Sequence, residues 1–188
     1  MAQKRLVIDG FGQLELNNVA FRRDGRVEAQ CALDATDFKT VAAENGMLLA
    51  VDKVAGTVRM PDGSEVCPVG LNYPSEHMYD ERTNALKNFK LTIKDGFYPR
   101  IGYLAIGDKF TTNCVSYDSG KDSTWTTEEK FIEALGSIGT TKLYGTQSAD
   151  GSILVSATAP TTGIKLLVIQ KTTMPDGQLG IKFQVIGA

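Results

Sequence analysis

Much of the chain consists of short runs in which apolar and polar residues alternate. Val27, Ala29, Cys31 and Leu33 alternate with Glu28, Gln30 and Ala32, and a similar alternation runs from Leu179 to Val185. In a β-strand, a period of two places one set of side chains inward and the other set toward water. These segments are therefore predicted to be half-buried strands.

Seven Asp-Gly or Asn-Gly pairs separate such runs, at residues 9–10, 24–25, 45–46, 62–63, 95–96, 150–151 and 176–177. Glycine adopts positive φ at no steric cost, and Asp or Asn tolerates the left-handed region, so these pairs favour tight reversals between strands. The pattern predicts a mainly β fold, an antiparallel sandwich or barrel with one or two short helices.

Further strands are predicted at residues 47–52, 56–60, 65–71, 89–94, 98–106, 109–117, 142–146, 153–157 and 164–171. Pro61-Asp62-Gly63 lies between the predicted strands 56–60 and 65–71. It has the residues of a β-turn, so the two strands are predicted to form a hairpin. Pro68 has no N–H to donate to a ladder, so the strand that contains it is expected at a sheet edge or at a bulge.

Two segments change to a helical period. Residues 35–44 carry apolar side chains three and four positions apart, which predicts a helix of about two turns. After residue 125 the chain offers a capping box, with Thr126 at the cap and Glu129 three positions later, followed by Phe131, Ile132 and Leu135 on one face. A second helix is expected there, and it would end before Gly136.

Composition places the chain among ordinary globular proteins, since 42% of its 188 residues are hydrophobic and 22% are charged. We expect one β-rich domain over residues 1–188. The net charge is −2 and the charges are mixed, so nucleic acid is not an expected partner. A membrane is not expected either, because the chain has neither a signal-peptide core nor a run of about 20 apolar residues. Folding in a cytoplasm follows from these features.

Candidate catalytic chemistry is sparse. His77 is the single histidine, and the three cysteines are far apart, which favours buried free thiols over disulfides or a zinc site. Gly120-Lys121 lacks the upstream glycine of a phosphate loop, and Gly10-Phe11-Gly12 lacks the third glycine of a dinucleotide fingerprint. The sequence predicts a protein that is not an enzyme and has no cofactor or metal.

Two groups of apolar residues are candidate contacts with a protein partner. The first group lies close to the N-terminus and consists of Leu6, Val7, Ile8 and Phe11. Residues 1–20 would either form an extended arm that adds a strand to a neighbour or supply an ordinary first strand of the chain's own sheet. The second group, in a predicted surface loop, consists of Tyr73, Met78 and Tyr79. Its members would either anchor an interface or pack into a local core.

The order of segments from Gly46 to Asn113 resembles that of tailed-bacteriophage head decoration proteins, which are also called capsid cement proteins. The resemblance is carried by Gly46-Met47-Leu48-Leu49-Ala50-Val51-Asp52, by Gly56 to Leu71, by Phe97 to Tyr103 and by Ile106-Gly107-Asp108-Lys109-Phe110. It covers a little over a third of the chain. The helix after Thr126 and the β tail lie outside it, which leaves a tail or neck protein of a virion as an alternative.

The resemblance implies a small structural subunit of the virion that is assembled in the host cytoplasm. Such a subunit would form a homo-oligomer and would bind the major capsid protein on the outer face of the capsid lattice, which it would stabilise without catalysis. A different class remains open, namely a carbohydrate-binding β-domain. Its stacking platform would consist of Tyr98, Tyr103, Tyr117 and Trp125.

Overall fold

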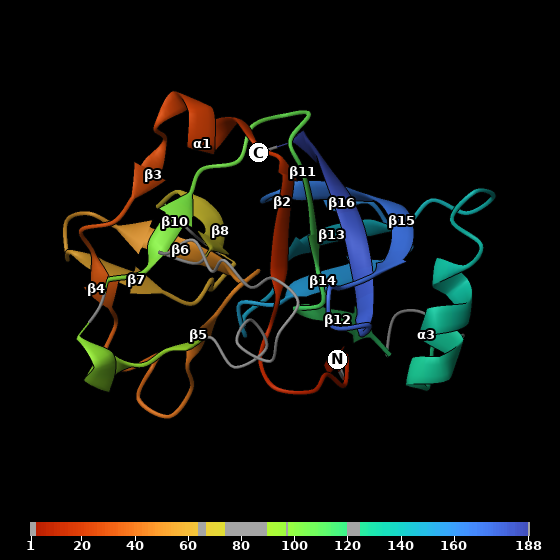
Figure 1. Cartoon of the computed structure of the whole chain (residues 1–188), viewed down its shortest axis with the longest axis horizontal. Coiled ribbons are helices and arrows are strands. Elements are labelled where there is room, and N and C mark those ends of the chain that lie inside the picture. The colour runs from red at the N-terminus through yellow and green to blue at the C-terminus, as the bar shows by residue number, and fades with distance from the viewer. Residues whose placement is uncertain (1–2, 64–66, 74–89, 97, 120–124, 188) are drawn as a thin grey trace.

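The computed structural model of the chain describes residues 3–63, 67–73, 90–96, 98–119 and 125–187. Over these residues the protein is mainly β, with two main sheets, a small third sheet and two short α-helices, as the sequence predicts (Figure 1). Neither main sheet closes into a barrel within the described ranges.

The larger sheet has eight strands in the order β1-β12-β14-β13-β15-β16-β11-β2. Neighbouring strands are antiparallel except β12 and β14, which are parallel. The strands are β1 (Gln3–Arg5), β2 (Leu14–Asn18), β11 (Lys109–Thr112), β12 (Val115–Asp118), β13 (Tyr144–Gln147), β14 (Ile153–Ser156), β15 (Lys165–Thr173) and β16 (Leu179–Gly187).

The second sheet has six strands in the order β3-β10-β8-β6-β7-β4. They are β3 (Val27–Glu28), β4 (Ala32–Leu33), β6 (Leu48–Asp52), β7 (Thr57–Arg59), β8 (Val69–Tyr73) and β10 (Arg100–Gly102). A two-stranded sheet pairs β5 (Ala43–Glu44) with β9 (Lys90–Leu91). The helices are α1 (Ala20–Asp24), α3 (Glu128–Leu135) and the 3-10 turn η1 (Ile93–Asp95). In Figure 1, α3 lies at the end of the molecule away from the six-stranded sheet.

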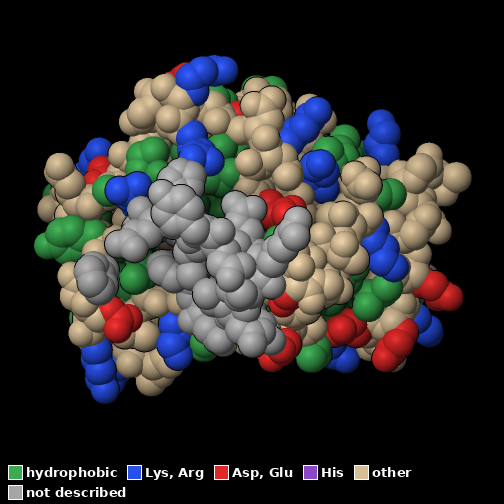
Figure 2. Space-filling view, viewed as in Figure 1, with side chains coloured by type: hydrophobic (Ala, Val, Ile, Leu, Met, Phe, Trp, Pro, Cys, Tyr) green, Lys and Arg blue, Asp and Glu red, His purple; other side chains and the backbone are tan. Residues whose placement is uncertain are grey.

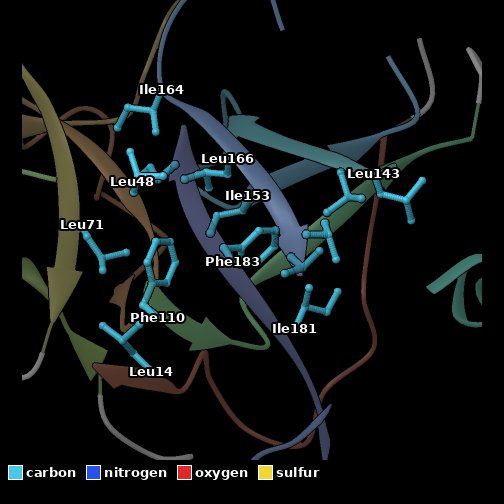
Figure 3. Close-up of a cluster of buried hydrophobic side chains, with 14 of the residues drawn as sticks. Leu14, Leu48, Leu71, Phe110, Leu143, Ile153, Ile164, Leu166, Ile181 and Phe183 are labelled. Atoms are coloured by element: carbon cyan, nitrogen blue, oxygen red, sulfur yellow. The ribbon is translucent and has the colours of Figure 1, made fainter. Parts of the chain in front are cut away.

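The two main sheets share a hydrophobic core. Figure 3 shows Leu48 and Leu71, from the six-stranded sheet, beside Phe110 and Phe183 of the eight-stranded sheet. The two phenylalanine rings lie 5.7 Å apart between centroids, and all four side chains are fully buried. Burying a side chain of this size stabilises a fold by roughly 1.5–3 kcal/mol. A second hydrophobic cluster packs around the six-stranded sheet and includes Met47, Leu49, Val51, Val58 and Ile101.

The predicted helix at residues 35–44 does not form. Instead, the Asp34 carboxylate accepts the N–H groups of Thr36 (2.8 Å) and Asp37 (3.2 Å), which makes a turn at the point where the helix would start. Asp side chains compete with a helix in this way because they hydrogen-bond nearby backbone groups. The chain then extends into β5.

The predicted hairpin between residues 56–60 and 65–71 is also wrong. Both segments contain a strand, β7 and β8, but β6 lies between them and pairs with each. Pro68 precedes β8, and its carbonyl accepts the Val51 N–H at 2.9 Å. Because the proline lies outside the strand, β8 can take an interior place in the sheet between β6 and β10, contrary to the expectation of an edge or a bulge.

Other predicted boundaries shift. The strand at 27–33 is divided into β3 and β4 because the Glu28 carboxylate accepts the N–H groups of Ala29 (3.0 Å) and Gln30 (2.8 Å). Asn113 and Cys114 divide the strand predicted at 109–117 into β11 and β12. In the described part of the strand predicted at 89–94, β9 ends at Leu91 and η1 begins at Ile93. The second helix forms, but its N-cap is Thr127 rather than Thr126.

Candidate functional site

Within the described residues 3–20, β1 and β2 pair with strands of the chain's own eight-stranded sheet, which fits the interpretation as an ordinary first strand. The extended arm that adds a strand to a neighbour stays a prediction. β1 pairs with β12, and the Leu6 N–H donates to the Val115 carbonyl at 2.9 Å. Leu6 is only 3% exposed and belongs to the core that the two sheets share. It cannot contact a partner while the chain is folded.

Val7, Ile8 and Phe11 have different environments. Val7 is 82% exposed, and its N–H donates to a carboxylate oxygen of Glu128 at 2.9 Å. Ile8 is half-buried and packs against the large core. Phe11 is half-buried, with the Lys90 ammonium 4.4 Å from its ring centroid. Of these three residues, Val7 and Phe11 offer most to a partner.

The second group of predicted contacts is described only in part. Tyr73, at the end of β8, is half-buried and packs on the core, with its ring 5.1 Å from the Phe21 ring. This position fits packing better than an interface. Met78 and Tyr79 lie outside the described residues, as does His77.

The four aromatic residues of the expected sugar platform do not form one surface. Tyr117 and Trp125 are 3% and 4% exposed, and their rings pack on Phe131 at 4.8 and 5.4 Å between centroids. Tyr98 is exposed, whereas Tyr103 is half-buried at a separate cleft between the two sheets. A stacking platform of all four residues is therefore wrong, because two of them build the core around α3.

A groove of about 860 Å³ opens beside Phe11. Apolar side chains line it, among them Phe11, Phe38, Val41, Met60 and Ile93. Val41 is 48% exposed and Ile93 is 41% exposed. Large apolar side chains this open to water mark a surface that can bury them against another molecule.

Lysines surround these apolar residues. Lys39, Lys90 and Lys94 are all exposed and all line the groove, which we call the lysine-rimmed groove. Arg5 also lines it and binds Glu44 through both terminal nitrogens. The groove thus combines apolar contact area with three solvent-exposed ammonium groups.

The carboxylates that line the groove are engaged within the chain. Asp37 accepts the Met60 N–H at 2.8 Å, and Asp150 accepts the Ser152 N–H at 3.0 Å. Glu44, the third, is paired with Arg5. Counting Arg5 with the three lysines, the lining carries four cationic and three anionic side chains, so the charge that a bound molecule would meet is positive by a small margin.

A second cleft, of about 1440 Å³, lies between the two main sheets. Its lining mixes apolar and polar groups, and the polar side chains include Tyr103, Tyr144, Thr146 and Gln147 on one part and threonines within residues 158–163 on another. Gln147 orders this second part, since its side-chain oxygen accepts the Ile164 N–H at 2.8 Å. Hydroxyl and amide groups of this kind could hydrogen-bond a neutral polar ligand.

Two of the three cysteines, Cys31 and Cys114, are buried thiols. Burial raises the pKa of the Cys114 thiol to about 12, although the neighbouring Arg5 opposes this effect. Burial also raises the pKa of Cys31. Because the thiolate is the nucleophilic form, these two thiols are unreactive near neutral pH. Over the described parts of the chain, no cluster of three or more His, Cys, Asp or Glu side chains could hold a metal.

The charges on the surface in Figure 2 are interspersed, with Lys and Arg side chains beside Asp and Glu over the described area. No helix within the described ranges is long and apolar enough to cross a membrane. Comparisons with protein-family models, with curated proteins and with solved structures find no match for this chain.

Sequence reasoning identified Phe11 but missed the groove beside it. Val41 belonged to the apolar face of a predicted helix and Ile93 to the inner face of a predicted strand, so both were expected inside. Turns form at both places and leave these side chains partly in water. Asp34, at the start of one turn, and Asp95-Gly96, at the end of the other, are the sequence signals that could have indicated the groove.

Proposed function

We propose that this protein is a non-catalytic structural subunit of a phage virion that binds the outer surface of the capsid lattice and stabilises it. One observation carries the proposal. The described residues between Gly46 and Asn113, where the resemblance to decoration proteins lies, include β7, β6, β8 and β10, which are adjacent in one sheet. Four strands of this stretch are thus neighbours in one sheet, whereas β9 and β11 of the same stretch belong to the two other sheets.

The motif residues in this part have structural roles that suit a scaffold. Asp108 is buried, and its carboxylate accepts the N–H of Ala20 at 2.8 Å and of Ala105 at 2.9 Å, which ties α1 to the start of β11. Gly46 adopts a φ of +85°, and a Cβ there would lie 2.1 Å from the Thr112 hydroxyl oxygen. Asp108 thus fixes the entry to β11, and the missing side chain of Gly46 lets the chain before β6 approach Thr112 of the other sheet.

Binding without catalysis suits a lattice protein. Each contact can be weak, because symmetric copies on one capsid add their contributions through avidity. Partners in this proposal are the major capsid protein and further copies of the chain itself. The exposed Val7 and the lysine-rimmed groove are the surfaces available for such contacts.

Co-sedimentation with capsids tests the proposal. Purified protein is mixed with empty capsids of the phage that encodes it, and the pellet is analysed at increasing protein concentration. We expect binding that saturates at a fixed number of copies for each capsid and a higher temperature of capsid disassembly. Protein that stays in the supernatant at every concentration contradicts the proposal. Light scattering after size exclusion measures the oligomeric state, and we expect a homo-oligomer rather than a monomer.

A carbohydrate-binding role is the competing function, and the cleft between the two main sheets, with Tyr103 and Tyr144 among its lining residues, is the observation that favours it. A glycan array separates the two functions. Binding of a defined sugar that is lost in Tyr144→Ala supports the cleft as a sugar site. For a tail or neck protein, antibody labelling of virions in the electron microscope would place the label away from the head.

A further inference from the structure

We propose that the lysine-rimmed groove binds an extended, acidic peptide segment with interspersed apolar residues. In the virion this segment would belong to the major capsid protein, an assignment that rests on the proposed function. The chemistry of the groove itself does not depend on that assignment.

The apolar part of the groove sets the first requirement for the ligand. Val41 and Ile93 each leave about half of their surface in water, at 48% and 41%, and Phe11 lies between solvent and core. Burying apolar surface is worth roughly 25 cal/mol for each Å². A ligand with apolar side chains would therefore gain affinity here, whereas a purely ionic ligand would leave these residues exposed.

The charges set the second requirement. Lys39, Lys90 and Lys94 are exposed around the groove, whose lining as a whole carries four cationic and three anionic side chains. Complementary charges speed association and select the partner. Three ammonium groups around an apolar lining thus favour glutamate or aspartate at positions between the apolar residues of the ligand.

The groove is held in shape before any ligand binds. At one side, the Asp95 carboxylate accepts the Thr92 N–H at 2.6 Å and the Thr92 hydroxyl at 2.8 Å, which fixes the turn that carries Ile93 and Lys94. At the other side, Glu44 of β5 is paired with Arg5. A preformed site binds with less loss of conformational entropy than one that must be ordered by its ligand.

A direct binding measurement tests the proposal. The probe is a fluorescent peptide of repeated Glu-Val-Glu units, and the comparison peptide has Lys-Val-Lys units. The test variant is Lys39→Glu/Lys90→Glu/Lys94→Glu. A matched control, Lys130→Glu/Lys142→Glu/Lys171→Glu, reverses three exposed lysines that do not line the groove. All six positions are exposed, but Lys90→Glu also removes the contact with the Phe11 ring, so circular dichroism and melting temperature check that both variants keep the fold.

We expect fluorescence polarisation to show that wild type and control bind the acidic peptide alike. The test variant should bind it about tenfold more weakly or worse, since each exposed ion pair contributes about 0.2–1 kcal/mol. Added salt should weaken wild-type binding. Ile93→Asp should weaken it as well, through the apolar part. Equal binding by the test variant, or equal affinity for the Lys-Val-Lys peptide, overturns the proposal.

Capsid co-sedimentation with the same variants separates this inference from the proposed function. Loss of sedimentation in the test variant alone supports both. Unchanged sedimentation of the test variant supports the capsid role and overturns the groove as its contact. Peptide binding that depends on the three lysines, together with no capsid binding by the wild type, supports the groove chemistry and contradicts the capsid role. A test variant that changes oligomeric state instead of peptide binding assigns the groove to a second copy of the chain and overturns the proposal.

Discussion

The guanidinium of Arg5 binds the Glu44 carboxylate through both of its terminal nitrogens, and so joins the first strand of the eight-stranded sheet to the two-stranded sheet. Glu44 is 8% exposed and also accepts the Gly12 N–H at 2.6 Å. Both partners of this carboxylate, Arg5 and Gly12, lie in the N-terminal segment, far from Glu44 in the sequence. This pair fixes one wall of the lysine-rimmed groove.

Replacing Arg5 should destabilise the protein strongly. In Arg5→Met the Glu44 carboxylate stays buried without its cation, which costs about 3 kcal/mol or more in such pairs. Urea denaturation at neutral pH measures the free energy of unfolding. Arg23→Met is the matched control, since Arg23 and Asp24 form an exposed pair on α1, with side chains 77% and 39% exposed. Equal losses in the two variants would contradict the structural role of Arg5.

The Glu28 carboxylate should make stability depend on acid pH. Its pKa is lowered by the hydrogen bond from the Lys53 ammonium at 2.7 Å and by the Gln30 N–H, although burial opposes the shift. A carboxyl group with a lowered pKa in the folded state stabilises the fold above its ordinary value of 4.5, and this contribution is lost as the pH falls through the folded pKa.

Glu28→Gln tests this dependence. Glutamine keeps an oxygen to accept the backbone N–H groups but removes the charge, so the variant should be less stable than the wild type at neutral pH. The difference between the two should shrink as urea unfolding is repeated at lower pH. A difference that stays constant from neutral pH to below the ordinary carboxyl range would show that the charge of Glu28 contributes nothing.

Thiol labelling should distinguish the cysteines. Cys31 and Cys114 are buried, whereas Cys67 is half-buried. With a chromogenic disulfide reagent near neutral pH, the folded protein should release one equivalent of colour quickly, and full reaction should need denaturant. Cys67→Ser should remove the fast phase. If the fast phase persists in that variant, a buried thiol is more accessible than the structure indicates.

Adjacent positions near the N-terminus should respond in opposite ways. Leu6→Ala removes a core side chain and should lower the free energy of unfolding by about 2–5 kcal/mol. Val7→Asp changes an exposed residue, so stability should stay within about 0.5 kcal/mol of the wild type, while capsid binding should weaken if Val7 contacts the lattice. Urea unfolding curves measure the free energy of unfolding of both variants, and co-sedimentation measures their binding to capsids. Full capsid binding by Val7→Asp would remove this residue from the interface.

Local patterns predicted the C-terminal half of the fold well. Residues 164–171 and 179–185 cover most of β15 and β16, each of which runs two residues further, and the Met174-Pro175-Asp176-Gly177 turn joins them as a hairpin, with Gly177 at a φ of +90°. Here the strand pattern and the turn residues agree, and the paired strands are neighbours in the sequence. Under these conditions local propensity decides the structure.

Pairing between distant segments could not be predicted in this way. Nothing in Gln3–Arg5 identifies β12 as its partner, and nothing in the run at 56–60 excludes the hairpin that β6 prevents. The choice depends on which arrangement buries Leu6, Leu48 and the other core residues together. The groove was missed for the same reason, because Val41 and Ile93 are exposed only once two turns replace the predicted helix and strand.

The place of β16 in the eight-stranded sheet has a consequence for synthesis. β16 lies between β15 and β11, so within the described residues β11 and β2 are hydrogen-bonded to the rest of the sheet through residues 179–187. A chain that stops before residue 179 therefore lacks the strand that unites the two portions. Any product without residues 179–187 leaves the sheet incomplete and cannot enter an assembly that requires the finished surface.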